Sequence, residues 1–189
     1  MLPKGSIAKV YKYYFTAPEF SEEVMCALRE FYNRPDLERG GSLGTTKQGE
    51  IFFNEWFLYD FVLNNGYTPI KNFIITNPFN LNELEMKLYK DLLDSEYGMF
   101  EVLDMERSKS LTIKDLQTNK KWLMNEYRAT FDTEKGYVFF GRIGKVDDHY
   151  ELIGADTFST QDIDEVTKKS FRKEKFKLTP KTINDIFRI

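Results

Sequence analysis

The sequence predicts an α+β fold in which a helical N-terminal part, residues 1–96, packs on a small five-stranded antiparallel β barrel-like module, residues 97–155. Residues 156–189 form a charged C-terminal extension. Apolar residues recur at helical spacing up to about residue 95, and after Gly98 they form short runs rich in β-forming side chains. After Gly154 the chain turns polar, which separates the extension from the β module.

Composition bounds the class of protein. A chain of 189 residues fits one domain or two small ones that share a core. It is 41% hydrophobic and 30% charged, which is typical of a soluble globular protein, and the 16% of aromatic residues must be buried or used on a partner. Cys26 and His149 are the only residues of their types, which excludes an internal disulfide framework and a Cys/His zinc cage within one chain.

These bounds predict a cytoplasmic protein that needs no metal or other cofactor. The N-terminus lacks an apolar run of the length that a signal peptide requires, and no window approaches the roughly 20 apolar residues of a membrane span. A single cysteine fits a reducing compartment. Lysine outnumbers arginine 19 to 8, which is typical of a low-GC bacterium or its phages.

The first expected elements are a short strand at residues 9–15 and a helix that starts at Ser21 and ends before Pro35. Val24, Leu28 and Phe31 repeat at the spacing of one helix face. Residues 39–49 contain four glycines and predict a mobile loop.

The next helix is expected at residues 50–64, at the start of a stretch, 50–73, that holds eight aromatic residues. Phe53, Phe57 and Phe61 form a ridge along this helix, and we expect the ridge to pack against another helix, at residues 21–34 or 80–92. We expect Trp56 and Leu88 to be buried.

Two shorter helices follow. Thr68 and Pro69 can cap and start one of them. Asn80 and Glu83 have the spacing of a capping box for the other, and its apolar face would contain Leu81, Leu84, Leu88 and Leu92.

Five short segments rich in Phe, Val, Leu, Ile and Tyr predict the strands of the β module. Turn residues separate them at a spacing of roughly ten residues, as in a small barrel or strongly bent sheet. The segments are 99–105, 110–116, 121–127, 137–143 and 148–154. In the extension we expect helices at 160–170 and 180–188.

Two blocks of the sequence resemble a known bacterial domain. Residues 55–60, EWFLYD, followed by residues 66–70, GYTPI, are similar to the EWFLFDY…DGxTP block of a domain of unknown function that often accompanies the SEC-C metal-binding motif. Further similarity within residues 95–102, 111–118 and 141–154 extends the match to about residues 50–155. The resemblance implies a helix bundle that leads into a β-rich module, and no known reaction. The SEC-C cysteines are absent, so their metal site is not implied here.

The candidates for catalysis are Glu55, Asp60 and His149. Glu55 and Asp60 lie five residues apart on one helix and therefore point to different faces. A buried Glu55 can equally serve as a structural acid with a nearby partner. His149 would need a nucleophile or an acid partner, and no spacing in the sequence identifies one.

The strongest charge asymmetry lies near the C-terminus. Residues 168–181 hold seven basic residues and one acid, whereas the rest of the chain has a net charge of −9. This segment is either a solvated helix face that neutralises the acidic stretch 81–106 or a binding site for nucleic acid or another acidic partner. Its candidate binding residues are Lys168, Lys169, Arg172, Lys173, Lys175 and Lys177, with Phe171 and Phe176 between them.

The sequence therefore predicts a non-enzymatic cytoplasmic binding protein of a bacterium or its mobile elements, with a protein or nucleoprotein partner. The alternative is an enzyme that acts on nucleotides or nucleic acid through Glu55, Asp60 and His149. Convergence of these three residues in one pocket would favour the enzyme.

Overall fold

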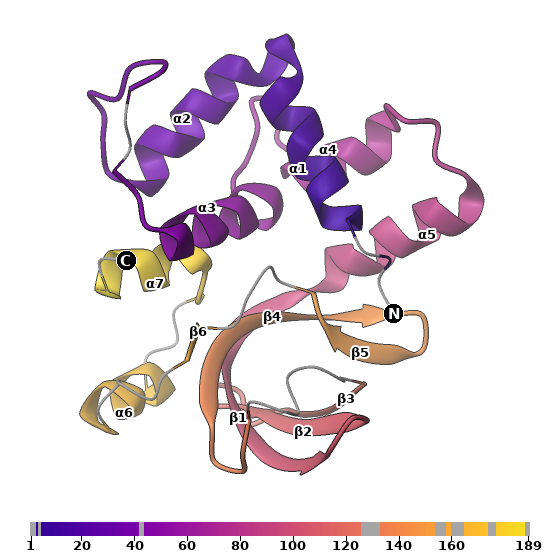
Figure 1. Ribbon diagram of the computed structural model, residues 1–189, viewed down its shortest axis with the longest axis vertical. Helices are drawn as coiled ribbons and strands as arrows, with labels where there is room; N and C mark the ends of the chain where they lie inside the picture. Colours follow the sequence, from indigo (N-terminus) through magenta and orange to yellow (C-terminus); the bar gives the residue numbers. More distant parts are fainter. Residues whose placement is uncertain are drawn as a thin grey trace. The chain divides into compact units, whose positions relative to one another are not determined.

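The computed structural model describes residues 3, 5–41, 44–125, 133–153, 158–159, 165–173 and 177–187 (Figure 1). The chain divides into two compact units. We call residues 2–93 together with 179–189 the helical unit, and residues 94–178 the barrel unit. The expected boundary near residue 96 lies close to the start of the barrel unit. The expected C-terminal extension is divided between the two units.

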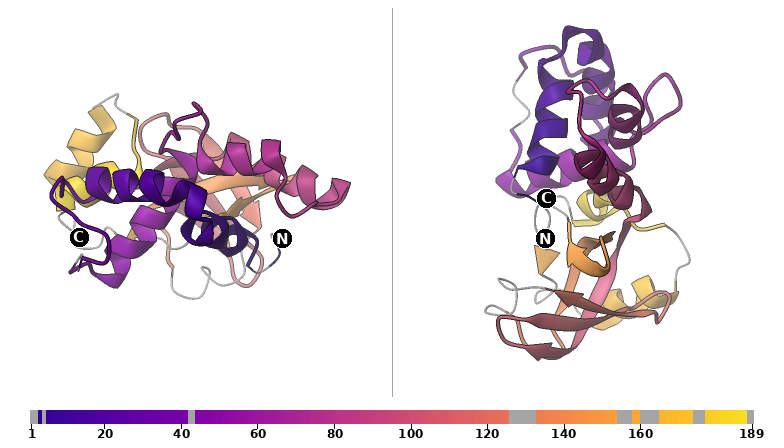
Figure 2. Two further views of the ribbon diagram at one scale, coloured as in Figure 1. Left: turned by 90° about the horizontal axis from the view of Figure 1, so that it is seen from above. Right: turned by 90° about the vertical axis from the view of Figure 1, so that its right-hand side faces the viewer.

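The helical unit contains helices α1 to α5 and α7 (Figure 2). A short 3-10 turn at Pro18–Phe20 joins α1 to α2, and another at Leu92–Asp94 follows α5. The helices are α1 Ser6–Thr16, α2 Ser21–Phe31, α3 Lys47–Tyr59, α4 Pro69–Thr76, α5 Glu83–Asp91 and α7 Pro180–Phe187.

The expected strand at residues 9–15 is wrong, because α1 covers it. Val and Tyr favour strands when they are considered locally, but Val10 and Tyr14 lie four residues apart and are both fully buried, so one helix face carries them into the core. Packing of this face outweighs the local preference.

Helix α3 is the central element of the helical unit. Thr46 caps it, since its hydroxyl accepts from the Gly49 N–H at 2.9 Å, and the helix therefore starts within the segment expected to be a loop. The ridge of Phe53, Phe57 and Phe61 is buried, as is Trp56. The Phe53 ring lies 5.4 Å from that of Phe31 on α2, so the predicted packing against the helix at 21–34 is confirmed.

The capping box of α5 lies two residues later than predicted. Asn82 accepts from the Glu85 N–H, and the Glu85 carboxylate accepts from the Asn82 N–H. Asn80 instead adopts a left-handed conformation with φ of 50° in the preceding turn. The buried face of α5 therefore differs from the predicted one. Leu84 is 81% exposed, Leu88 is half-buried, and Tyr89 contributes to the core.

A buried polar network holds the α3–α4 connection. The Tyr14 hydroxyl donates to the Pro69 carbonyl at 2.8 Å and accepts from the Asn72 amide at 2.8 Å. Asn72 in turn accepts from Asn65, at the turn where Gly66 has a φ of 82°. Since only glycine adopts this conformation without strain, the network and the turn together explain the GYTP block in structural terms.

The barrel unit is built from five strands that close on themselves, and a two-residue strand lies beside them. They are β1 Glu96–Glu106, β2 Ser110–Asp115, β3 Lys121–Asn125, β4 Val138–Val146 and β5 His149–Leu152, with β6 Phe158–Ser159 beside β4. Each of the five predicted strand segments therefore corresponds to one strand of the barrel, and residues 126–127 and 154 of those segments lie outside the described part of the chain. A register shift between Val102 and Asp104 marks a bulge in β1, which pairs with β4 through its first half and with β2 through its second.

The antiparallel arrangement predicted for the barrel is only partly right, because β3 pairs with β5 in parallel at Met124 and Tyr150. The strand order is β1-β2-β3-β5-β4, and β4 pairs with β1. A closed ring with an odd number of strands cannot alternate in direction throughout, so at least one parallel pair is required. This order, with its closure and its single parallel pair, is the connectivity of the OB-fold, a five-stranded Greek-key barrel.

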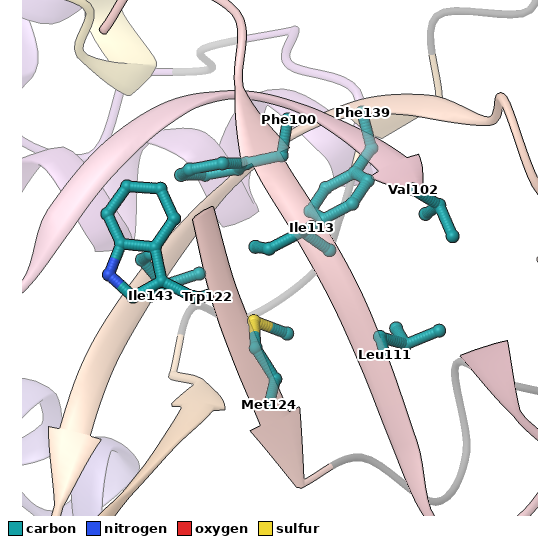
Figure 3. Packing of buried hydrophobic residues seen from close by; sticks show 8 residues of the cluster. All are labelled: Phe100, Val102, Leu111, Ile113, Trp122, Met124, Phe139 and Ile143. Carbon is teal, nitrogen blue, oxygen red and sulfur yellow. The ribbon is translucent and has the colours of Figure 1, made fainter. Parts of the chain in front are cut away.

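The barrel interior is filled by apolar side chains that alternate along the strands (Figure 3). Phe100 and Trp122 meet edge to face with ring centroids 5.8 Å apart. The cluster consists of Phe100, Val102, Leu111, Ile113, Trp122, Met124, Phe139 and Ile143.

Candidate functional site

The catalytic candidates are divided between the two units. Glu55 is buried in α3, with 3% of its surface exposed, and Asp60 is the residue at the C-terminal end of that helix. His149 belongs to the barrel unit, at the start of β5. Neither unit by itself therefore contains the predicted set of three residues.

His149 is held between two carboxylates. Its Nδ1 lies 3.1 Å from Asp148 Oδ1, and its Nε2 lies 2.6 Å from Glu151 Oε1. Hydrogen bonds to Asp148 and Glu151 raise the pKa of His149, and the hydrogen bond from His149 lowers the pKa of Asp148. An imidazole that donates through both nitrogens is an imidazolium, so the geometry suits a structural charged pair better than a general base.

The basic segment begins with helix α6, Glu165–Lys173, in the barrel unit. Phe171 was expected on the partner-binding face, but it is only 4% exposed. Its ring meets that of Phe140 on β4 at 5.4 Å, edge to face. Phe171 is therefore an anchor that holds α6 on the barrel, and its ring is not available for stacking on a ligand.

Among the described cations of this segment, Lys181 lies in α7 and pairs with Asp185 at 2.8 Å, and the others face solvent. Lys169, Arg172, Lys173 and Lys177 are exposed. Among the side chains that the structure describes, none forms an ion pair with Lys169, Arg172 or Lys173. The side chain of Lys168, and residues Lys175 and Phe176, lie outside the described part of the chain.

A tight turn between β2 and β3 fixes the position of α6 along the barrel. The Asp115 carboxylate accepts from the N–H groups of Gln117 and Thr118, both at 2.7 Å. The Gln117 side chain then donates to the Phe171 carbonyl at 3.3 Å. Gly98 makes room for Asp115, since a Cβ at residue 98 would lie 2.9 Å from Asp115 Oδ2.

Strand β2 and the turns at its two ends carry a second group of cations that the sequence analysis did not single out. Residues 107–121 contain five basic residues and one acid, the buried Asp115. Acidic residues of β1 pair with three of these cations: Lys114 with Glu101 at 2.8 Å, Lys120 with Glu96 at 3.2 Å, and Lys109 with Glu106. A count of charge over residues 107–121 would have found this group, but only the fold shows that the turn at Gln117 contacts α6.

In the described part of the chain, no group of three or more His, Cys, Asp or Glu side chains has the arrangement of a metal site. The described helices also include none with the length and apolar character needed to cross a membrane.

Comparison with protein families assigns the chain to a group without a known activity. A model described as a family of unknown function (DUF7986) matches residues 43–185, which is well over half of the chain, so the chain belongs to this family. No curated protein and no solved structure matches.

Proposed function

We propose that this member of the family is a non-enzymatic binding protein whose barrel unit engages a nucleic-acid-bearing partner through the basic face of α6. One observation carries the proposal. Phe171 is seated against Phe140, while Lys169, Arg172 and Lys173 project from the same helix into solvent. The apolar anchor makes α6 a fixed part of the barrel surface, and its cations are therefore presented in a defined place.

The charge spacing on α6 supports a role in binding. Lys169 lies three residues before Arg172 and four before Lys173, so the three cations share neighbouring positions on the helix surface. Like charges at these spacings destabilise a helix by roughly 0.2–0.5 kcal/mol per pair. A bound phosphate backbone places negative charge beside these cations and removes their repulsion. Each phosphate contact also releases counterions from the nucleic acid.

The same proposal covers the setting in which the protein works. The lysine-rich composition and the EWFLYD and GYTPI blocks support an origin in a bacterium or its phages, in proteins related to those that carry SEC-C motifs. The single cysteine supports a cytoplasmic location. The enzyme alternative has no support from the geometry of His149, whose ring nitrogens both meet carboxylates.

Titration of the protein into a labelled oligonucleotide at several salt concentrations tests the proposal. We expect log Kd to change linearly with log salt, by about 0.7–0.9 per phosphate contacted. In the triple variant Lys169→Gln/Arg172→Gln/Lys173→Gln, affinity should fall and the slope should flatten by roughly 2–3. The outward positions of all three side chains should leave the fold intact, which thermal unfolding can verify.

The matched control is Lys12→Gln/Lys47→Gln/Lys90→Gln, which removes the same charge from exposed positions of the helical unit. If both triple variants change binding equally, the effect is one of net charge and the assignment to α6 is wrong. If the wild-type protein binds no nucleic acid at low salt, the proposed function is wrong.

A further inference from the structure

We propose that Asn65 is a site of spontaneous deamidation, and that the hydrogen bonds of the α3–α4 connection control its rate. Asn65 precedes Gly66, and this is the only Asn-Gly pair in the chain. The site belongs to the helical unit, so the proposal is independent of the function proposed for the barrel unit.

The chemistry follows from the two residues of this pair. In deamidation, the backbone nitrogen after the asparagine loses its proton and attacks the side-chain Cγ. The new N–Cγ bond replaces the Cγ–Nδ2 bond, and ammonia leaves. Water then opens the five-membered imide at either of its carbonyls, which gives aspartate or isoaspartate. The net reaction consumes one water and releases one ammonia.

The exposed turn supplies what this reaction needs. Gly66 has no Cβ that would obstruct the attack of its nitrogen, and its φ of 82° lies in the region that glycine adopts without strain. Asn65 is exposed, so water reaches its side chain. The open chain is therefore reactive at this pair, and the question is what the fold does to the rate.

Both ends of the Asn65 carboxamide are held in the fold. Its Oδ1 accepts from the Tyr67 N–H at 3.1 Å, and its Nδ2 donates to Asn72 Oδ1 at 2.8 Å. The carboxamide can turn to meet the Gly66 nitrogen only after these bonds break. The nitrogen is held as well, because the Gly66 N–H donates to the Leu63 carbonyl at 2.9 Å.

The acceptor of the Asn65 amide is fixed by the core of the helical unit. Asn72 is 4% exposed, and its Nδ2 donates to the Tyr14 hydroxyl at 2.8 Å. Tyr14 is fully buried and donates to the Pro69 carbonyl. Because Asn72 cannot rotate its amide without losing Tyr14, its Oδ1 stays directed at Asn65. Deamidation therefore requires a local opening of the turn.

The reaction makes such an opening permanent. Isoaspartate adds a methylene to the main chain before residue 66, which displaces the turn that the Leu63 N–H closes on the Tyr67 carbonyl at 2.9 Å. Either product also replaces the amide by a carboxylate, which cannot donate to Asn72 Oδ1. A buried acceptor that loses its donor destabilises the fold, so the modified helical unit is less stable than the original.

Incubation of the full-length protein at mildly alkaline pH, in buffer and in concentrated urea, tests the proposal. Cleavage after Lys47 and Lys71 gives the peptide 48–71, in which mass spectrometry detects the conversion of the amide to an acid and fragmentation assigns it to Asn65. The next peptide, 72–87, is the internal control, since none of its asparagines precedes a glycine. We expect conversion in buffer to be at least about tenfold slower than in urea, because three hydrogen bonds must break first.

Two variants separate the turn from the general stability of the unit. Asn72→Ala removes the acceptor of the Asn65 amide and should speed conversion in buffer at least about twofold. Asn82→Ala is its control, since Asn82 caps α5 and its loss weakens the same unit without touching the turn. Circular dichroism verifies that both variants fold, and the comparison of wild-type protein in buffer and urea does not depend on either of them.

The outcomes that would overturn the proposal are distinct. If Asn65 keeps its amide in urea, it is not a deamidation site. Equal rates in buffer and urea would show that the fold does not control the reaction. If Asn82→Ala converts as fast as Asn72→Ala, the site opens with the whole unit and not through the hydrogen bonds of the turn.

Discussion

His149 gives the barrel a stability that depends on pH. The hydrogen bonds to Asp148 and Glu151 raise its pKa above the ordinary value of about 6.5, so the folded state prefers the protonated ring. This contribution is fully present below the ordinary pKa and is lost as pH rises through the raised folded-state value. The lowered pKa of Asp148 acts at the opposite end, since its contribution is lost only in acid.

We therefore predict that the stability difference between the wild-type protein and His149→Gln is largest near pH 5 and shrinks as the pH rises to about 9. In the variant, the glutamine side chain at position 149 is neutral at every pH, so the buried Glu151 carboxylate no longer meets a charged ring at that position. Urea unfolding at each pH in a Trp56→Phe background, followed by Trp122 fluorescence, measures the difference. A difference that stays constant from pH 5 to 9 would show that His149 is not charged in the fold.

At the scale of elements, the start of α5 shows what sequence reasoning can locate and what it cannot. Asn80 with Glu83 and Asn82 with Glu85 have the same spacing, so the sequence alone allows both capping boxes. The structure selects Asn82, because Asn77 ends α4 and its side chain accepts from the Leu81 N–H at 2.7 Å, which places Asn80 within the turn. We predict that Asn82→Ala lowers the free energy of unfolding by about 1 kcal/mol.

Asn80→Gly provides the control for this prediction. Asn80 has a positive φ that glycine adopts freely, so the substitution should be neutral or slightly stabilising. Chemical denaturation measures the stability of both variants. A larger loss of stability in Asn80→Gly than in Asn82→Ala would contradict the observed cap.

The strands were predicted better than the first helix for a physical reason. Strands β2 and β3 bury alternate residues, as in the pattern of Lys121 to Asn125, and this alternation can be read from the sequence. In α1 the local composition favours a strand. The helix is stabilised by contacts with residues distant in the sequence, such as the hydrogen bonds of Tyr14 with Asn72 and Pro69. The candidate site also divides into local and distant features. The basic residues of α6 can be read from the sequence, whereas the burial of Phe171 depends on Phe140, 31 residues earlier in the sequence.

At the scale of the whole molecule, the barrel unit is inserted into the helical unit. The chain leaves the helical unit after Leu93 and returns at Thr179, and α7 then packs on α3. Ile183 is fully buried in this position, and the Asn33 amide of the helical unit donates to Asp185 at 3.0 Å. The last helix of the chain therefore completes the unit in which the chain began.

This arrangement predicts that loss of α7 contacts weakens the helical unit and leaves the barrel unchanged. Ile183→Ala should lower the stability of the helical unit by roughly 2–5 kcal/mol, because it leaves a cavity against α3. Ile186→Ala is the control, since Ile186 is 46% exposed on the same helix. The two tryptophans report on the units separately: Trp56 is in α3 and Trp122 is in β3.

Thermal unfolding in Trp122→Phe and Trp56→Phe backgrounds, which leave Trp56 and Trp122 respectively as the fluorescent reporter, measures the prediction. Ile183→Ala should lower the midpoint that Trp56 reports and leave the Trp122 midpoint in place, because the side chains of the barrel core and those packed against it all belong to the barrel unit. Equal shifts in both midpoints would mean that the two units unfold as one cooperative structure. In that event, the proposed binding surface on α6 and the packing of α7 would be thermodynamically linked.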